Sequence, residues 1–336
     1  MNRNQFGLAA CAAAVLLGWA GLAGAQQRVV LYTSNEATLN KLVAAEFEKA
    51  TGIAVDVISA GSGVVIKRLQ SESARPQGDL VWGISRSLLQ TNAQYFDSYA
   101  SEHKSAIPAE FRDPQDRWIG TNLHLLVVLQ NTKSIPEAQG PKTWDDLTTP
   151  RFKGNIAFTD PANSGSAYSN VTMLVDLWGG GNAGWSKVER LFANTRVLNR
   201  SALVFQGVGN GEYGLGISLE YAGYLWANNG APVKVVYPAD GTIAQMEGVA
   251  VIKGGPNTAG ARKFVDYVNR KDVREMILKQ TFRRPARQDL DLANLPGKMP
   301  ALSQLKLLKY DEEGWTAKRG ETMDRIKETI QKTRGG

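Results

Sequence analysis

Serine and glycine residues are concentrated where an expected strand is followed by an expected helix near the middle of the chain. An apolar segment ends at Phe158, and a polar turn that contains Ser164, Gly165 and Ser166 follows it. A helix is expected next, because apolar residues recur on one face of residues 171–178. The first turn of a helix offers unpaired N–H groups and the positive end of the helix dipole. Together with small hydroxyl groups, this predicts a site for an anion such as a phosphate, phosphonate or carboxylate.

Taken alone, such a turn could equally reflect a serine that caps its own helix. The same arrangement occurs at two earlier places, however. An apolar strand expected at residues 29–32 is followed by Thr33 and Ser34, and a second apolar strand is followed by Ser62 and Gly63. Three such junctions favour one shared anion site, provided that the helices that begin there face the same cleft.

Two further strand ends add aromatic and acidic side chains. Trp82 closes a strand expected at residues 78–82 and is a candidate wall for a ligand, with simple core packing as the alternative. Glu220 and Tyr221 open the helix expected after a strand at residues 214–217. There Glu220 could receive an amine or the hydroxyl groups of a sugar. The alternative is a solvated glutamate that the helix dipole favours.

Strands that alternate with helices predict an α/β fold with mainly parallel sheets. In such sheets ligands bind beyond the carboxyl ends of the strands, which is the edge where these residues fall. A chain of 336 residues is expected to form two lobes. The apolar segments 123–131 and 247–252 are the expected connections between them, and the glycine-rich segment 203–211 is expected to contain a turn.

The first 25 residues are typical of a secretory signal peptide. One arginine precedes an apolar run at residues 8–22, and small residues at 23–25 form a cleavage site. The single cysteine, Cys11, lies in this segment. The expected mature chain therefore has no disulfide and no cysteine-based metal or nucleophile site.

Charge and motif content argue against several classes of protein. The chain carries 39 Lys and Arg against 32 Asp and Glu, a formal net charge of +7, but the basic residues form no stripe interleaved with aromatic residues. Nucleic acid is therefore not expected as a partner. His103 and His124 have no triad motif, Gly-x-Ser-x-Gly is absent, and no metal-ligand cluster is visible. We expect neither an enzyme nor a cofactor.

Five regions spread along the chain carry a family resemblance: Leu-Tyr-Thr-Ser at 31–34, Phe-Glu-Lys-Ala-Thr-Gly-Ile at 47–53, Ser-Glu-Ser and Pro-Gln-Gly-Asp-Leu within 71–80, Thr-Trp-Asp-Asp-Leu and Phe-Lys-Gly within 143–154, and residues 160–168. Together they resemble the periplasmic solute-binding proteins of ABC importers, in the group that binds ferric ion, phosphonates and sugar phosphates. The resemblance implies a periplasmic binding protein-like fold of type II, two α/β lobes joined by hinge strands. Residues 26–127 with 246–336 would form the first lobe and residues 128–245 the second.

The resemblance also implies a monomer in the periplasm that binds a small phosphorylated or other anionic solute, without chemistry on it. The expected partner is an ABC importer permease, which provides the only contact with the membrane. By similarity, the residues expected to bind the phosphoryl end of a sugar phosphate or aminophosphonate are Thr33, Ser34, Ser62, Gly63, Ser164, Gly165 and Ser166. Glu220 and Tyr221 are expected to bind the other end.

Ferric-ion binding is the alternative within the same group. Ferric binders similar to this chain use an adjacent pair of tyrosines. At the matching place this chain has Glu220 and Tyr221, with Tyr224 three residues on. The departure favours a phosphorylated solute, while iron held by these three side chains remains the second hypothesis.

Overall fold

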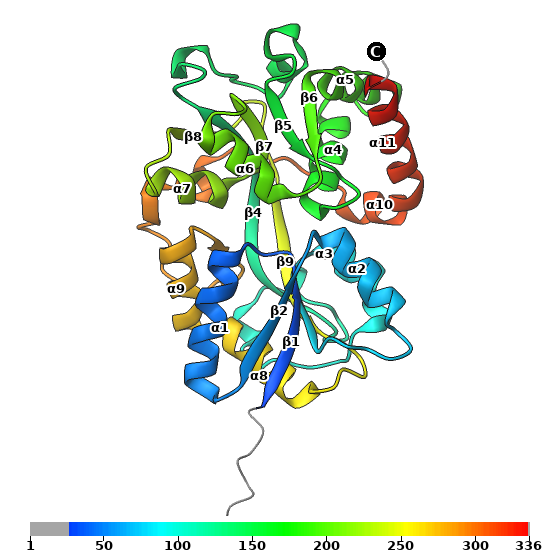
Figure 1. The fold of residues 1–336 in the computed structure, drawn as a ribbon, viewed down its shortest axis with the longest axis vertical. Helices are drawn as coiled ribbons and strands as arrows, with labels where there is room; N and C mark the ends of the chain where they lie inside the picture. Colours follow the sequence, from blue (N-terminus) through cyan, green and yellow to red (C-terminus); the bar gives the residue numbers. More distant parts are fainter. Residues whose placement is uncertain (1–26, 335–336) are drawn as a thin grey trace, which may run out of the picture.

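The computed structural model describes residues 27–334. They form two α/β lobes, one above the other in Figure 1, that are joined by the long strands β4 (Ile119–Asn131) and β9 (Ala244–Val251). The expected signal peptide at residues 1–25 lies outside the described residues. Within residues 27–334, no helix has the length and apolar content that crossing a membrane requires.

The lower lobe is built on three parallel strands that alternate with helices, as expected. The strands are β1 (Arg28–Thr33), β2 (Ala54–Ser59) and β3 (Leu80–Ser85), in the order β2-β1-β3, and β9 pairs antiparallel with β3. The helices are α1 (Ala37–Thr51), α2 (Ser62–Ser71), α3 (Arg86–Thr91), α8 (Thr258–Asn269) and α9 (Lys271–Thr281). Phe47 and Phe264 meet edge-on in the core, with ring centroids 5.1 Å apart, and hold α1 against α8.

The upper lobe repeats this architecture around the far half of β4. Its other strands are β5 (Ile156–Thr159), β6 (Thr195–Leu198), β7 (Leu215–Leu219) and β8 (Val233–Val236). β5 pairs in parallel with β6 and β7, whereas β7 and β8 pair antiparallel with β4. The helices are α4 (Gly165–Leu177), α5 (Gly181–Asn194), α6 (Ser201–Asn210) and α7 (Glu220–Asn228). The short β10 (Arg284–Pro285) pairs with β4.

Helix α6 replaces the turn that was expected in residues 203–211. Glycines at positions 207 and 209 lower the helix propensity of this segment, so the sequence pattern hides the helix. In the structure both glycines are contact points. A Cβ atom on Gly207 would lie 2.7 Å from the ring of Tyr213, and one on Gly209 would overlap the ring of Trp226. Packing therefore overrides propensity here.

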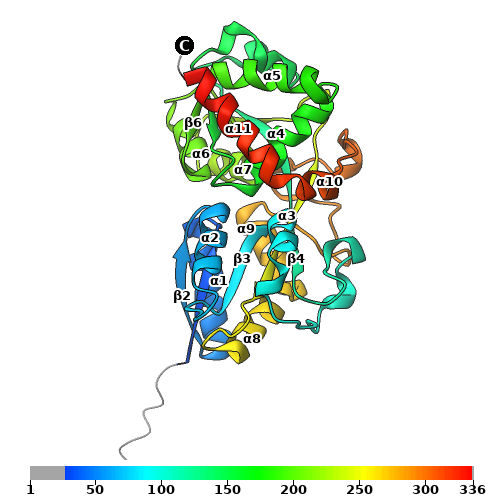
Figure 2. The ribbon, with the colours of Figure 1, turned by 90° about the vertical axis from the view of Figure 1, so that its right-hand side faces the viewer.

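The two C-terminal helices lie against the upper lobe, α10 (Glu312–Ala317) at its lower edge and α11 (Arg319–Arg334) along its side (Figures 1 and 2). Ile326 and Ile330 of α11 are buried in the same apolar cluster as Trp185 and Val188 of α5. Helix α11 thus packs with the second lobe, whereas the expected division placed residues 246–336 with the first. The four-residue spacing of the two isoleucines explains why a helix that is otherwise polar docks at all. Helix α10 contacts both lobes, since Glu312 pairs with Arg86 of α3 at 3.8 Å and Trp315 Nε1 donates to Asp176 of α4 at 2.7 Å.

The two connecting strands carry a buried ionic cluster. His124 Nε2 on β4 lies 2.7 Å from Glu247 Oε2 on β9, and Arg283 donates to Glu247 at 3.2 Å and also to Glu36. Asn122 donates to Glu247 Oε1 at 2.7 Å. Burial on its own would raise the pKa of Glu247, but the charges of His124 and Arg283 and the hydrogen bonds from His124 and Asn122 lower that pKa to about 2. The ionised carboxylate therefore ties both strands to the loop of Arg283.

This cluster predicts a pH dependence of folding. Because the pKa of Glu247 is lowered in the folded state, its stabilising contribution is complete above about pH 4.5 and is lost as the pH falls through about 2. We expect Glu247→Gln to lower the free energy of unfolding at neutral pH, because it removes the charge that pairs with the buried guanidinium of Arg283. The difference from the unmodified protein should shrink as the pH falls through that window.

Urea denaturation followed by tryptophan fluorescence at a series of pH values measures this difference. Glu137→Gln is the control, since Glu137 is an exposed partner of Lys234. A stability gap between Glu247→Gln and the unmodified protein that stays constant from neutral to acidic pH would contradict the assignment.

Candidate functional site

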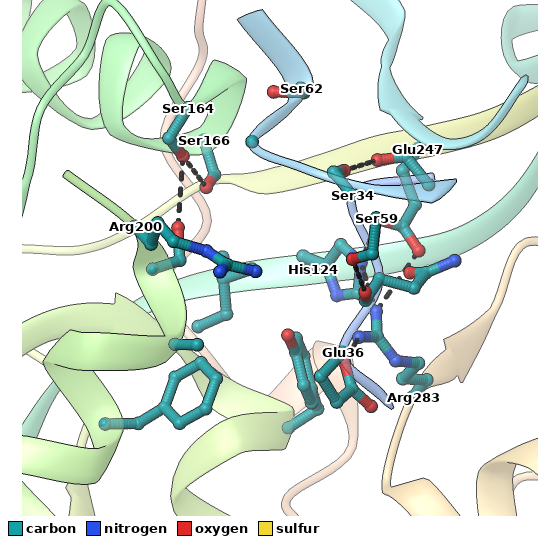
Figure 3. Close-up of a pocket in the computed structure, with 18 of the residues that line it drawn as sticks. Ser34, Glu36, Ser59, Ser62, His124, Ser164, Ser166, Arg200, Glu247 and Arg283 are labelled. Carbon is teal, nitrogen blue, oxygen red and sulfur yellow. Dashed lines mark hydrogen bonds and ion pairs between the residues drawn. The ribbon is translucent and has the colours of Figure 1, made fainter. Parts of the chain in front are cut away.

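A cavity of about 520 Å³ lies between the two lobes (Figure 3). The first lobe lines it with the start of α1 and with the turn before α2, the second lobe with the starts of α4, α6 and α7, and the connecting strands with His124 and Glu247. The cavity therefore lies beyond the carboxyl ends of strands from both sheets, the position at which open α/β sheets bind ligands.

Helices α1 and α6 begin at this cavity from opposite lobes. In neither helix does the N-cap side chain accept a hydrogen bond from the first turn. In α6 the N–H of Leu203 donates to the carbonyl oxygen of Arg200 at 3.1 Å, so the N–H groups before it are the ones that can donate to a ligand. The N-cap residue of α6 is Arg200, which is exposed and whose guanidinium points into the cavity (Figure 3). The structure records no ion pair for Arg200 within residues 27–334. The dipole of α6 and this cation thus give the side of the cavity around Arg200 a positive potential.

Four hydroxyl groups form a chain on the wall that the second lobe contributes. Thr159 Oγ1 lies 3.3 Å from Ser201 Oγ, which lies 3.4 Å from Ser164 Oγ, and Ser164 Oγ lies 3.0 Å from Ser166 Oγ. Ser164 also caps α4, because its Oγ accepts from the N–H of Ala167 at 3.3 Å. Ser164, Ser166 and Ser201 all line the cavity, so capping and ligand contact are compatible roles for Ser164.

Helices α2 and α4 also begin at the cleft, but they donate to each other's junctions. Gly165 N–H, the first of α4, donates to Ser62 Oγ at 2.9 Å, and Gly63 N–H of α2 donates to the carbonyl oxygen of Asn163 at 3.3 Å. The N-termini of α2 and α4, two of the three that were expected to face a shared ligand, therefore use backbone N–H donors in a contact between the lobes. Only α1, of those three, keeps its first turn open to the cavity.

Glycine makes this contact between the lobes possible. A Cβ atom on Gly63 would overlap the carbonyl oxygen of Ala162, and one on Gly61 would overlap that of Asn163. Since both obstacles are backbone atoms, neither can turn aside as a side chain would. The two junctions, residues 61–63 and 162–165, are held here in direct contact, which closes one side of the cavity.

The structure separates the ten site residues expected from the sequence into two groups. The cavity is lined by Ser34, Ser62, Ser164, Ser166 and Tyr221. It is not lined by Thr33, Gly63, Trp82, Gly165 or Glu220. Gly63 and Gly165 act in the contact between the lobes, and Thr33 Oγ1 accepts from the N–H of Asn35 at 3.1 Å. Trp82 is fully buried and packs edge-on against Phe264, so it belongs to the core rather than to a ligand wall.

Glu220 does not line the cavity, because its carboxylate is hydrogen-bonded to a buried arginine and to a tyrosine outside it. Arg284 grips its carboxylate with two hydrogen bonds, of 2.6 and 2.8 Å, and Tyr237 donates to it as well. The hydroxyl of Tyr224 lies 3.3 Å from that of Tyr237, while its ring stacks on Phe282. The acidic position that the sequence suggested at the ligand is thus part of a structural network.

Tyr221 is the one member of the hypothetical ferric set that reaches the cavity. Burial raises the pKa of its hydroxyl above the ordinary range, and the guanidinium of Arg283 lies 3.6 Å from its ring centroid. Glu220 and Tyr224 do not join it there. Within residues 27–334, no three His, Cys, Asp or Glu side chains are grouped to hold a metal ion.

The sequence analysis missed four charged residues of the cavity: Arg200, Glu36, Glu247 and Arg283. Arg200 was overlooked because α6 was not recognised, although an arginine just before a serine and an apolar segment is compatible with a helix start. Glu36 and Arg283 are distant in sequence and meet only through the fold. No local sequence pattern predicts an ion pair between residues so far apart in the chain.

The chain matches the family model described as bacterial extracellular solute-binding protein over residues 84–312. An uncharacterized protein of Haemophilus influenzae is 28% identical over 329 residues, which cover 94% of each chain. A putative 2-aminoethylphosphonate-binding periplasmic protein of Salmonella typhimurium is 23% identical over 258 residues, 73% of each chain. Iron uptake protein A1 of Synechocystis is 23% identical over 277 residues, 78% of this chain and 76% of its own.

Solved structures of periplasmic binding proteins share the two-lobed fold. AfuA of Actinobacillus pleuropneumoniae, with exogenous fructose-6-phosphate bound, superposes with a TM-score of 0.83 at 25% identity and covers 91% of this chain and 99% of its own. Iron-bound HitA of Pseudomonas aeruginosa superposes with a TM-score of 0.77 at 21% identity and covers 90% of this chain and 99% of its own. The expected type II fold is therefore confirmed. With the family match and the cleft between the lobes, it follows that the chain belongs to the bacterial extracellular solute-binding proteins and is the periplasmic substrate-binding component of an ABC importer.

Proposed function

We propose that this protein captures a small solute with a phosphoryl or phosphonyl group, either a sugar phosphate or an aminophosphonate. The observation that carries the proposal is Arg200, whose guanidinium points into the cavity and forms no ion pair with any of the described residues. A guanidinium binds phosphate oxygens with two parallel hydrogen bonds, and helix N-termini bind them with backbone N–H groups. The protein would act as a monomer that delivers the solute unchanged to the permease.

The arrangement of charges in the cavity supports an anion next to Arg200. Arg283 forms ion pairs with both Glu36 and Glu247, whereas Arg200 forms none within residues 27–334, so the positive charge at the start of α6 stays open to a solute. Ser164 and Ser166 add neutral donors on the same side of the cavity (Figure 3). A phosphoryl group between Arg200 and the start of α1 would therefore meet donors from both lobes.

The other end of the solute would lie towards Glu36 and Tyr221. Both line the cavity, and Glu36 comes from the first lobe whereas Tyr221 comes from the second. A carboxylate can accept from an ammonium group or from sugar hydroxyls, which is the role that the sequence suggested for Glu220. The relatives named for 2-aminoethylphosphonate and for bound fructose-6-phosphate fit these two kinds of solute.

Ferric ion is the competing solute, because the chain is also similar to proteins named for iron uptake or solved with iron bound. The side chains of this chain favour ferric ion less than a phosphorylated solute. The ring of Tyr221 is covered by a guanidinium, and Glu220 and Tyr224 are engaged outside the cavity. A trivalent cation would be repelled by the adjacent positive charge, whereas a phosphoryl dianion would be attracted.

Replacing Arg200 tests the proposal most simply. In isothermal titration with fructose 6-phosphate and with 2-aminoethylphosphonate, we expect the unmodified protein to bind one or both. Arg200→Gln should bind the same compound roughly ten-fold to a hundred-fold more weakly, the usual value of a charge-assisted hydrogen bond. Arg190→Gln is the matched control, because Arg190 is an exposed arginine on α5 of the same lobe, away from the cavity. Equal affinities for Arg200→Gln and the control would reject the phosphoryl site. A coloured ferric complex, with no binding of either compound, would favour iron.

The contact between the lobes yields a separate prediction. Gly63→Ala should oppose closure, because the new methyl group meets the carbonyl of Ala162 only when the lobes touch. We expect a faster dissociation of the bound solute and an affinity lower by roughly ten-fold, since overpacking costs about 1–3 kcal/mol. The melting temperature without solute should change little.

Stopped-flow dissociation measures this effect. Gly320→Ala is its control, since a Cβ atom at Gly320 in α11 would meet nothing within 4 Å. If Gly63→Ala released solute at the rate of the control, the contact would have no part in closure.

A further inference from the structure

Asn170 is a buried polar residue that the site described so far does not use. It lies on α4, one turn after Ser166, and its side chain is 1% exposed. Neither Oδ1 nor Nδ2 of its carboxamide has a hydrogen-bond partner among the described residues. Leaving a buried donor and a buried acceptor unpaired is costly, so a carboxamide in this position needs a partner from outside the chain.

Asn170 lines a small recess that adjoins the main cavity. The recess has a volume of about 20 Å³ and lies between α4, α6 and β7. Ser166, Ser201 and Tyr221 line both the recess and the main cavity, so the two spaces share a boundary. A volume of this size holds one water-sized group, because a single water needs roughly 10–15 Å³ on the same measure.

The walls of the recess decide which kind of group fits. Half of its lining residues are apolar, including Phe205 and Leu219, the others carry neutral polar groups, and no charged residue lines the recess. An ion there would lose its hydration without gaining a countercharge. The carboxamide of Asn170 offers one donor group and one acceptor, which a hydroxyl group satisfies by accepting from Nδ2 and donating to Oδ1.

We propose that Asn170 is a specificity-determining residue that holds one hydroxyl-type oxygen in this recess. The oxygen belongs either to the solute or to an ordered water that the solute contacts. The inference about the solute rests on the proposed function: where the oxygen belongs to the solute, a sugar phosphate is favoured over an aminophosphonate, because its carbon-bound hydroxyl groups can enter the recess. Inorganic phosphate and simple alkylphosphonates have no carbon-bound hydroxyl group.

Crystal structures at a resolution that shows ordered waters test the occupancy directly. We expect an oxygen atom within hydrogen-bond distance of both Asn170 Oδ1 and Nδ2 in the protein without solute. In crystals with fructose 6-phosphate, a sugar hydroxyl takes that place or contacts the same water, which distinguishes the two sources. A recess without density in both crystals would overturn the proposal, whether or not the phosphoryl group is bound.

Titrations with two probes test the specificity role. We expect Asn170→Leu to weaken binding of fructose 6-phosphate roughly ten-fold or more while leaving the affinity for inorganic phosphate within about two-fold. Met173→Leu is the matched control, because Met173 is equally buried on the same helix but does not line the recess. Asn170→Ala serves as a second variant if the leucine disturbs folding, as judged by circular dichroism.

The outcomes separate this inference from the proposed function. Unchanged affinity for fructose 6-phosphate in both Asn170 variants would overturn the specificity role even if an oxygen occupies the recess. It would leave the phosphoryl site of Arg200 intact. If the unmodified protein bound neither probe, the proposed function would fail, and the density in the recess would still decide whether Asn170 holds an oxygen.

Discussion

Direct contact between two strand-to-helix junctions, one from each lobe, is the constraint on which the cleft depends. Residues 61–63 and residues 162–165 meet through Ser62 Oγ and two backbone N–H groups, and glycine at 61 and 63 leaves room for the opposing carbonyls. This contact sets how closely α1 and α6 can face each other across the cavity. A few ångströms of extra separation would take the donors of one lobe out of reach of an anion held by the other.

Electrostatics then divides the cavity into two regions. On one side Arg283 pairs with both Glu36 and Glu247, and this network ties β4 and β9 to the start of α1. On the other side Arg200 and the uncapped start of α6 keep their positive potential for a ligand. The same chain thus uses one arginine to stabilise its fold and another to attract solute, and burial with carboxylate partners distinguishes them.

Much of the fold could be predicted from the sequence, because it depends on local patterns. The strands before Thr33 and Ser62 are regular apolar segments, and the turn at Ser164 has helix-capping chemistry that the structure confirms. The role of Arg200 was hidden, since the glycines of α6 resemble a turn until Tyr213 and Trp226 are seen to pack on them. The position of Glu220 was equally hidden. It opens a helix near the cavity, yet its direction is set by Arg284, which is distant in sequence.

The proposed mode of binding requires that hydrogen-bond donors from both lobes contact the charged group of the solute at the same time. The most direct measurement is the position of the phosphoryl group in a crystal of the protein with fructose 6-phosphate. Its oxygens should lie between the N–H groups of the first turn of α1 and the guanidinium of Arg200. A sugar phosphate bound in the reverse direction, with its phosphoryl group beyond hydrogen-bond distance of both Arg200 and the first turn of α1, would contradict this placement.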